Sequence, residues 1–572
     1  MVESVFKTPL YAAFFCAVIL AACTSDPSDP PTTSTPCPGG NTPIASVQGS
    51  TPKSPIAGQQ VNVHGIVTLL QADGFYMEEP GSDAIERTSN AVFIQTARLP
   101  DSLAYGSVVS VSGVVSEIDK GRHSLTAITD VTELIQCSSG LDLPLTDVSL
   151  PLNGLQREAL EGMRIQINDP LMVTDVYRFG RGNFTLSGNG LQFVPTEIRK
   201  PGAESATLLE QNRAFALPAM LPDSMDQPEL LVSGSQVDYI SGILAHDERG
   251  LRISLESITS NPHTGFTAPD TASPGTLRVV GMNLHNYFNG EGKALSFPGS
   301  RGAKTAAEFK QQRDRIGAAI GVLDPQLIAV MELENDGFDD DSAAVDFIQL
   351  ATSVSGKSWA VTRPAGDDTG TDEIAVGLFY RSDRLKPIGP AQTLGGEEFT
   401  FSRQPQAQVF QPLPDGEKIL VVINHLKSKG SCPDEGENTD QKDGQGCWNP
   451  MRLAAAKRMS AWAKNVALST GTENILILGD MNAYRNEDPI NAIRQAGFKE
   501  LMDEKQGKTY SFVFFGQHGT LDYAFSSESL LDNIDNAFIW NVNAAVPVNM
   551  ELPQPWLGFS DHDPVVVDIK IN

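Results

Sequence analysis

The pattern of hydrophobic and polar positions divides the chain into two parts near residue 270. Residues 40–260 contain short runs in which apolar and polar residues alternate, such as 59–70 and 106–118, separated by turns rich in Gly, Asp, Ser and Asn. Alternation with a period of two is typical of β-strands with one buried face. About five such strands between Val61 and Glu133 predict a small barrel of the OB type. A second β-rich stretch follows, from about Leu155 to Ile258.

The C-terminal part has a different pattern. Apolar strands such as "LIAVMELE" and "NILILGDMNA" alternate with helical stretches at 305–323 and 451–468. Strands that alternate with helices indicate a layered α/β domain, here of roughly 300 residues. The preceding segment, 261–276, is rich in Pro, Thr, Ser and Gly and predicts a linker.

The N-terminus has the features of a targeting segment. Lys7 precedes an apolar run, Tyr11 to Leu20, that is short for a membrane span and typical of a signal peptide. The run ends in Leu-Ala-Ala-Cys23, which resembles a bacterial lipobox, so we expect Cys23 to be lipidated. A cleaved signal peptide with an incidental cysteine is the alternative. Residues 24–36 are rich in Ser, Thr, Pro and Asp and predict a disordered tether.

These patterns give one order of segments along the chain. We predict a signal peptide at 1–23, a tether at 24–36, an OB-like β-barrel at 37–140, a second β-rich region at 141–262, a linker at 263–275 and an α/β domain at 276–572.

Composition narrows the classes of protein that fit. The chain has 572 residues, a hydrophobic fraction of 40% and a formal net charge of −28. The apolar content supports a sizeable core and excludes a mostly disordered chain. The acidity is spread over both halves, which argues against a protein that reads DNA sequence with a basic domain. A polyanionic substrate still fits if metal ions and local cations supply the positive charge.

The cysteines agree with export to an oxidising compartment. Besides Cys16 and Cys23 of the targeting segment, four remain, at 37, 137, 432 and 447. Four cysteines allow three pairings. Cys432 and Cys447 flank one polar loop, so we expect them to pair, which leaves Cys37 and Cys137 to bracket the first domain. A zinc site is the alternative, but the sequence has no CxxC motif.

Polar residues suited to metal and phosphate chemistry follow the buried strands of the C-terminal part. Asp480 and Asn482 are two residues apart, so both side chains point to the same face of a strand. His562 has a carboxylate on each side, and a hydrogen bond to a carboxylate orients an imidazole and raises its basicity. The full set of candidates is Asn283, Glu332, His425, Asp480, Asn482, Asp522, Asp561 and His562.

The ordered series "VVGMNLHNYFN", "IAVMELEND", "VINHLKSKG", "ILGDMNA", "GTLDYAF" and "SDHDP" resembles the endonuclease/exonuclease/phosphatase superfamily. Further segments, including "KSKGSC" and "GDMNAYRNEDPI", are similar to bacterial extracellular or surface nucleases with an N-terminal OB-like region. The resemblance implies an α/β (α+β) fold of the deoxyribonuclease I type, a four-layered β-sandwich flanked by helices, after the all-β OB-like region. The family's acidic pair after "WNVNA" is replaced here by Ala545 and Val546, which affects no proposed ligand.

The resemblance also implies a role for each candidate. Glu332, Asn283 and Asp561 would bind a catalytic divalent cation, Mg²⁺ or Mn²⁺. His562 would activate water, held by Asp522 and assisted by Asp480, while Asn482 would bind the phosphate. His425 would be a second imidazole, acting as acid or phosphate ligand, with Asp372 as a candidate to orient it. Lys427 and Lys429 are candidates for phosphate contacts or, alternatively, belong to a solvated loop.

The function implied is a metal-dependent extracellular nuclease with little sequence preference, acting on DNA or RNA. A phospholipase C or nucleotide phosphodiesterase on the same fold, and a surface lipoprotein that binds nucleic acid without cleaving it, are the alternatives. We expect a monomer attached to the outer membrane or cell surface by its lipid, or released from it. Residues 335–341 and 434–443 could hold a structural Ca²⁺, although acidic surface loops are the favoured interpretation of both segments.

Overall fold

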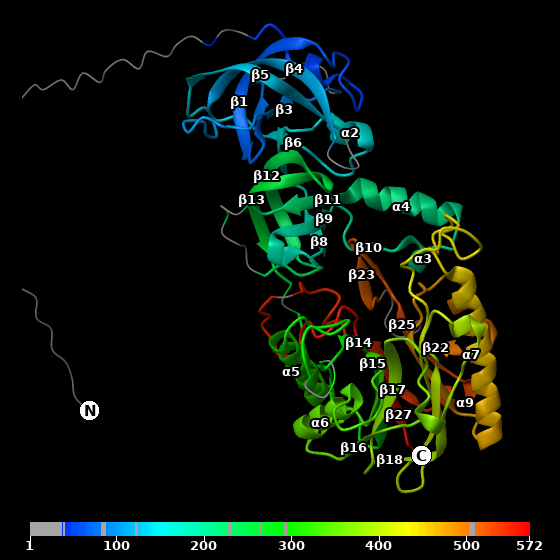
Figure 1. Cartoon of the computed structure of the whole chain (residues 1–572). Coiled ribbons are helices and arrows are strands. Elements are labelled where there is room, and N and C mark those ends of the chain that lie inside the picture. Colours follow the sequence, from blue (N-terminus) through cyan, green and yellow to red (C-terminus); the bar gives the residue numbers. More distant parts are fainter. Residues whose placement is uncertain are drawn as a thin grey trace, which may run out of the picture.

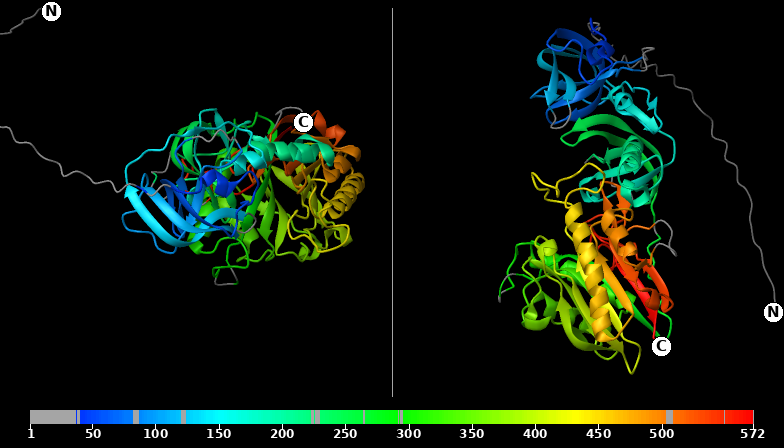
Figure 2. Two further views of the ribbon diagram at one scale, coloured as in Figure 1. Left: turned by 90° about the horizontal axis from the view of Figure 1, so that it is seen from above. Right: turned by 90° about the vertical axis from the view of Figure 1, so that its right-hand side faces the viewer.

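The computed structural model describes Cys37 and residues 40–571, except 82–86, 120–123, 223–224, 226–229, 264, 291, 293–294, 503–508 and 549. The predicted signal peptide, lipidation site and tether, residues 1–36, lie outside the described residues. Within the described part, no helix is long and apolar enough to cross a membrane. Figures 1 and 2 show an elongated molecule in which three β-structures follow one another along the long axis.

The first β-structure is a closed barrel of five strands in the order β1-β2-β3-β5-β4. Alternate strand residues such as Val61, Val63, Val109 and Val111 point inward and fill it. A short helix at Ile44–Gln48 precedes these strands, and the assignment of the region to an all-β domain of the OB type stays a prediction. The strands are β1 (Gln60–Gln71), β2 (Gly74–Glu78), β3 (Ala91–Gln95), β4 (Val108–Asp119) and β5 (Ser124–Ser138).

The second β-structure is a seven-stranded sheet in the order β13-β11-β9-β8-β12-β7-β6, in the region predicted to be β-rich. The structure also places a long helix here, α4 (Ala203–Phe215), which the strand pattern did not predict. The strands are β6 (Thr146–Asp147), β7 (Arg164–Ile167), β8 (Leu171–Asp175), β9 (Asn183–Ser187), β11 (Ala216–Met220), β12 (Gln236–Asp247) and β13 (Gly250–Asn261).

The C-terminal part contains two six-stranded mixed sheets. One has the order β16-β17-β15-β14-β27-β26 and consists of β14 (Thr276–Tyr287), β15 (Leu327–Glu334), β16 (Trp359–Val361), β17 (Ile374–Arg381), β26 (Ile534–Ile539) and β27 (Val565–Lys570). The other has the order β18-β19-β20-β21-β25-β22 and consists of β18 (Leu385–Thr393), β19 (Gln406–Pro412), β20 (Ile419–His425), β21 (Ile475–Asp480), β22 (Lys499–Glu500) and β25 (Asp522–Ser526).

The two sheets pack face to face, and helices cover their outer faces. Val279 and Leu327 of one sheet share a buried cluster with Val421 and Leu476 of the other. On the outer faces, Val280 packs with residues of α5 (Ala306–Leu323) and α6 (Ala343–Ser355), and Leu420 packs with residues of α7 (Asn449–Thr470). Successive strand residues therefore serve the inner and the outer core in turn. The predicted four-layered sandwich is confirmed.

The helices begin where the sequence provides caps. Thr305 and Ser342 accept hydrogen bonds from the first turns of α5 and α6. The helices are α1 (Ile44–Gln48), α2 (Gly154–Glu158), α3 (Pro195–Ile198), α4, α5 (Ala306–Leu323), α6 (Ala343–Ser355), α7 (Asn449–Thr470), α8 (Asp488–Gln495) and α9 (Glu528–Leu531), with 3-10 turns η1 (Phe179–Arg181), η2 (Ala365–Asp367) and η3 (Glu397–Phe399).

A small three-stranded sheet joins the N-terminal half to the sandwich. Strand β10 (Gln192–Phe193) pairs with β24 (Gln517–Gly519), which forms a hairpin with β23 (Phe512–Phe514). The aromatic run at 510–516 predicts a strand before Asp522, and residues 512–514 do form one, but it lies outside the main sheets. Figure 1 shows β10 and β23 between the seven-stranded sheet and the sandwich.

Both predicted disulfides are present. Cys37 bonds to Cys137, and Cys432 bonds to Cys447. The zinc alternative is therefore wrong for these four residues. The first bridge ties the segment before the barrel to the end of β5, and the second closes the polar loop before α7.

Candidate active site

Strand direction brings most of the predicted residues to one end of the sandwich. Strands β14 and β15 are parallel, and so are β20 and β21, so their carboxyl ends lie together. In the register of the second sheet, His425 lies beside Asp480, and Asp480 lies beside Asp522. The loop before β27 adds His562. One edge of the sandwich thus collects side chains that are far apart in the sequence.

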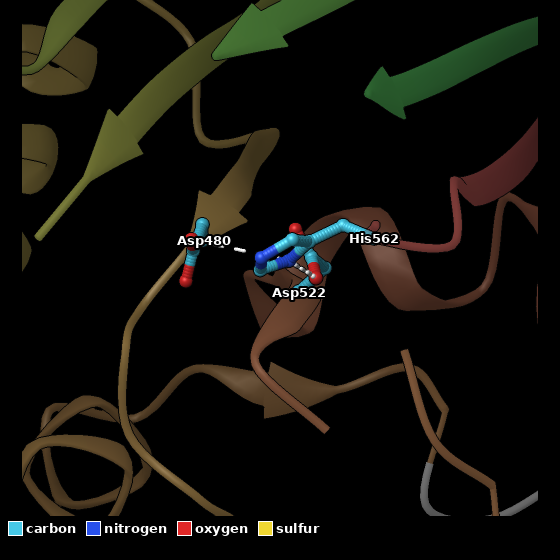
Figure 3. Close-up of side chains that lie close together, drawn as sticks. All are labelled: Asp480, Asp522 and His562. Carbon is cyan, nitrogen blue, oxygen red and sulfur yellow. Dashed lines mark hydrogen bonds and ion pairs between the residues drawn. The ribbon is translucent and has the colours of Figure 1, made fainter. Parts of the chain in front are cut away.

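A short polar contact joins His562 to Asp522 at this edge. Nδ1 of His562 lies 2.7 Å from Oδ2 of Asp522 (Figure 3). Ser511 donates to the same carboxylate oxygen at 2.7 Å, and the ring of Phe512 packs on the imidazole with 4.6 Å between centroids. These contacts fix the orientation of the ring and leave its second nitrogen, Nε2, to exchange a proton.

Asp480 links this pair to the second imidazole. Its Oδ2 lies 4.0 Å from Nδ1 of His562 and 3.3 Å from Nε2 of His425. The backbone N–H of Asn482 donates to Oδ1 of Asp480 at 2.8 Å, and the Asn482 amide lies 3.3 Å from Oδ2. Two imidazoles and the phosphate-binding candidate therefore meet around one buried carboxylate, as the sequence predicted.

Burial and charge shift the proton affinities of these groups. Burial raises the pKa of Asp480 to about 7, although His562 opposes the shift. Burial alone would lower the pKa of His562, but Asp522, Asp480 and Asp561 outweigh it and raise that pKa well above its usual value. Burial, reinforced by the charge of Arg403, holds the pKa of His425 well below its usual value. His425 is thus neutral and His562 strongly basic.

Several buried polar atoms at this edge have no hydrogen-bond partner among the described residues. They are Oδ1 of Asp522, Nδ1 of His425 and Oδ1 of Asn424. An unsatisfied buried polar atom is costly, and such atoms are few in native structures. Each of these three atoms can form a further hydrogen bond, as can unsatisfied buried atoms elsewhere in the described residues.

Glu332 is positioned by the end of the neighbouring strand β14. Its carboxylate accepts hydrogen bonds from the Asn283 amide at 3.1 Å and from the backbone of Asn286 at 2.9 Å. The backbone is unusual around it, because Glu332, His285, Asn286 and Asn482 all have positive φ angles, 60°, 52°, 57° and 46°. Non-glycine residues in this region are uncommon and gather at functional sites.

Asn283 was predicted to bind the cation, but its amide nitrogen donates to Glu332, another predicted ligand. Its Nδ2 faces Glu332 and lies 3.5 Å from Asp480, while its Oδ1 accepts a hydrogen bond from the backbone of His285. In this structure the Asn283 amide therefore orients the carboxylates of Glu332 and Asp480, and its oxygen faces the backbone of His285 instead of a cation. Asp561, in the loop before β27, lies near the end of β14, with its Oδ1 3.5 Å from Nδ1 of His285.

The donors at this edge fit a small divalent cation. Glu332 is partly exposed and forms no ion pair with lysine or arginine among the described residues, and the charged groups that act on Asp561 are His285 and His562. Mg²⁺ binds through one or two carboxylates and keeps several waters, which this sparse set of oxygens allows. Asp480, Asp522 and His562 also bring ligand atoms within 4.8 Å of one another. A metal there would compete with the His562–Asp522 hydrogen bond, so we assign that group to proton transfer.

Other predicted residues have different partners. The carboxylate of Asp372 lies 3.8 Å from Arg403. Of the two ring nitrogens of His425, Nε2 faces Asp480 and Nδ1 has no partner among the described residues, so the prediction that Asp372 orients His425 is wrong. Lys429 bonds to Glu487 at 2.5 Å and to a carbonyl at 2.6 Å, so it holds the loop together and does not contact phosphate. Burial lowers its pKa to about 8. Lys427 lies over the ring of Trp448 and stays a candidate for a phosphate contact.

The sequence did not reveal several residues that complete the site. Ser511 and Phe512 act on the Asp522–His562 pair from a separate hairpin, and the Asn543 amide donates to the carbonyl of His562 at 2.6 Å. His285 and Asn286 follow Asn283 directly, so their place in "MNLHNYFN" was the available signal. In the two loops considered for Ca²⁺, no cluster of three metal-binding side chains occurs among the described residues.

Comparison with solved structures finds proteins of the endonuclease/exonuclease/phosphatase superfamily. The human Nocturnin catalytic domain with bound sulfate is 17% identical over 53% of this chain and 97% of its own, with a TM-score of 0.36. A superfamily protein from Bacteroides vulgatus is 15% identical over 52% and 99%, with a TM-score of 0.35. D. rerio TDP2 in complex with single-strand DNA product is 11% identical over 51% and 98%, with a TM-score of 0.33.

No protein-family model matches the chain, and no curated protein sequence matches it.

Proposed function

We propose that this protein is a divalent-metal-dependent phosphodiesterase that hydrolyses nucleic acid, as an endonuclease with little sequence preference. The observation that carries the proposal is the arrangement around Asp480. Three groups surround this carboxylate: the basic imidazole of His562, the neutral imidazole of His425 and the amide of Asn482. The side chain of Asn283 connects it to Glu332. Phosphodiester hydrolysis needs a proton acceptor for the attacking water and stabilisation of charge on the phosphoryl oxygens.

His562 is the proton acceptor in this mechanism. Its Nδ1 stays bonded to Asp522, and because its pKa is raised, the resting ring is an imidazolium that must first release its Nε2 proton to solvent. Nε2 then takes the proton of the attacking water. Asp522 compensates the imidazolium that forms, and Asp480, at 4.0 Å, adds a second carboxylate. A base whose charged form is stabilised in this way holds the proton while the P–O bond to the leaving group breaks.

The opposite side of the site stabilises the phosphoryl group. The Asn482 amide is a hydrogen-bond donor beside Asp480, and neutral His425 carries one N–H. With that hydrogen on Nδ1, His425 donates to an oxygen of the substrate, while its Nε2 accepts from the protonated form of Asp480. Glu332 and Asp561 would hold the cation, which when bound supplies positive charge to a non-bridging oxygen. Asn283 and Asn286 keep Glu332 in place.

The proposal includes the setting of the enzyme. The signal-like segment, the Leu-Ala-Ala-Cys23 sequence and the disulfides support export, and we propose an outer-membrane lipoprotein at the cell surface, monomeric, or released from it. The barrel, residues 60–138, is proposed to be of the OB type. A structural Ca²⁺ is not part of the proposal.

The test is a comparison of substrates and metals. Purified protein is incubated with plasmid DNA, RNA and phosphatidylcholine vesicles, with Mg²⁺ or with EDTA, and with the His562→Ala variant as the control. We expect cleavage of nucleic acid that EDTA and the variant abolish. Hydrolysis of lipid without cleavage of nucleic acid would select the phospholipase alternative, and binding without cleavage would select the lipoprotein that only captures nucleic acid.

The Glu332→Gln variant tests the metal ligand, because it keeps the shape of the side chain and removes its charge. We expect its activity to require at least about tenfold more Mg²⁺ for half-saturation, since carboxylate charge sets much of the affinity for a hard cation. His562→Ala should gain nothing from added metal. Equal Mg²⁺ dependence in wild type and Glu332→Gln would place the cation elsewhere.

A further inference from the structure

The β23–β24 hairpin carries two exposed aromatic rings next to the active site. Phe514 is 55% exposed and Phe515 is 79% exposed, the latter among the most exposed large apolar side chains of the described residues. Apolar surface of this size is usually covered or used for binding.

The backbone conformation of the hairpin turn is unfavourable for Phe515, the residue at its tip. Phe514 pairs with Gln517, so Phe515 and Gly516 are the two turn residues, with φ angles of 47° and 74°. Positive φ at both positions defines a type I′ turn, in which Asn-Gly is strongly preferred. A phenylalanine in this conformation is strained, and here it is also exposed to water. Neither folding nor solubility accounts for an aromatic ring at this position.

The two rings continue a series of rings that begins at the proposed base. Phe512 lies on His562 with centroids 4.6 Å apart, and it stacks with Phe514 at 6.3 Å and an interplanar angle of 19°. Phe514 then contacts Phe515 edge to face at 4.5 Å. An aromatic surface therefore leads from the reacting centre to solvent.

The hairpin is held rigidly in this position. Strand β10 pairs with β24 on one side, and Gly516 lies so close to β8 that an added Cβ would be 2.9 Å from Oγ1 of Thr174. His518, on the buried face, bonds to Ser233 and to the carbonyl of Gln192. The exposed rings thus sit on a fixed support, and little ordering is needed when a flat ligand binds.

We propose that Phe514 and Phe515 form a stacking platform for unpaired nucleobases of the substrate, next to the phosphate that is cleaved. The proposal rests on the proposed nuclease function and names the single-stranded form as the preferred substrate. Stacking on aromatic side chains tolerates every base, because each base has a π-face. It also needs no cationic groove, which suits a chain with a net charge of −28.

A lipid surface is the other occupant that exposed aromatic rings suggest. The observations favour a base, because the exposed part consists of two rings that continue stacked contacts from His562, with Gln517 and the carboxylate of Asp175 beside the turn. A membrane anchor of this size would be weak.

The experiment compares two strands of equal length and backbone charge. One is a short oligodeoxythymidine, and the other is an abasic strand with tetrahydrofuran in place of every nucleoside. For wild type we expect kcat/KM to favour the strand with bases by about tenfold or more, the order that one stacked base contributes. In Phe514→Ala/Phe515→Asn the ratio should fall to near one, while cleavage of the abasic strand stays unchanged.

Two controls separate stacking from folding. Asn suits the type I′ turn, so Phe515→Asn alone should keep or raise the melting temperature while it lowers the ratio. Leu468→Ala, which removes an 82% exposed apolar side chain from α7, should leave the ratio unchanged.

The outcomes distinguish the two levels of the proposal. If wild type cleaves both strands and the double variant keeps the preference for bases, only the platform is wrong. If the double variant loses vesicle binding but keeps that preference, the tip contacts membrane, and the platform is again wrong. If wild type cleaves neither strand, the nuclease function fails and the platform fails with it.

Discussion

The sandwich contains two buried polar regions with opposite properties. Near the start of β14, Arg278 and Asp568 are almost fully buried and pair at 2.7 and 2.8 Å, and Arg278 also donates to two carbonyls. At the active-site edge, Asp522 on β25 and His425 on β20 each keep a buried atom without a partner among the described residues. Burial is equal in the two regions, but only the first is satisfied.

This difference separates stability from function. A buried ion pair whose hydrogen bonds are complete has no capacity left for a ligand, whereas a buried cluster with unpaired atoms does. We therefore expect substitutions in the first region to change the free energy of unfolding, and substitutions in the second to change catalysis.

The largest effect should come from the proposed base. His562→Ala should reduce kcat by about 10²–10⁴-fold, the usual contribution of a general base, without lowering the melting temperature. Asp480→Ala should act through the same step, so the double variant should be little worse than His562→Ala. Steady-state rates on an oligonucleotide, with circular dichroism as the folding control, test this. Simple additivity of the two losses would show that these residues do not act together.

The Arg278–Asp568 pair should show the reverse. Asp568→Ala leaves a buried guanidinium unpaired and should lower the free energy of unfolding by about 3–5 kcal/mol, as measured by urea denaturation. The rate per folded molecule should not change. Arg278→Met/Asp568→Leu removes both charges and should cost less than the single change. A larger loss in the double variant would mean that the pair itself, and not the orphaned charge, determines stability.

His518 gives a smaller, pH-dependent effect. Burial lowers its pKa to about 4, so the folded protein keeps it neutral. The unfolded chain takes up this proton near pH 6.5, hence stability is complete above that pH and falls as the pH drops toward 4. The loss should be about 3 kcal/mol at most. His518→Gln should remove this part of the pH dependence of unfolding, and an identical profile for wild type and variant would contradict the assignment.

The sequence predicted the sandwich and most of its polar edge because that information is local. Unbroken apolar runs marked the central strands, and the polar residue that ends each run marked the edge, so Asp480, His425 and Asp522 were identified with their neighbours. The disulfides followed from the spacing and even number of the cysteines. These features depend on composition over a few residues, which periodicity records directly.

The missed features depend on contacts between distant segments. The residues buried in helix α4 are Ser205 and Asn212, both polar, so the helix has no buried hydrophobic stripe by which periodicity could predict it. Lys429 pairs with Glu487, and Asp372 faces Arg403. The partners in each pair are far apart in the sequence, so no motif spacing predicts either contact. The short run at Phe512–Phe514 predicted a strand but not its partner, β24, or its separation from the main sheets.

The contacts around β10 have a consequence for a protein exposed to proteases. Glu197, which lies before the linker, accepts hydrogen bonds from Thr520 and Arg485, which lie after it, and Thr196 donates to Glu487 at 2.8 Å. A single cut within 265–275 would therefore yield a nicked enzyme, whose two pieces stay joined by a shared sheet and buried polar bonds. Conversely, a fragment that begins at residue 276 lacks the strand that supports the hairpin beside its own active site.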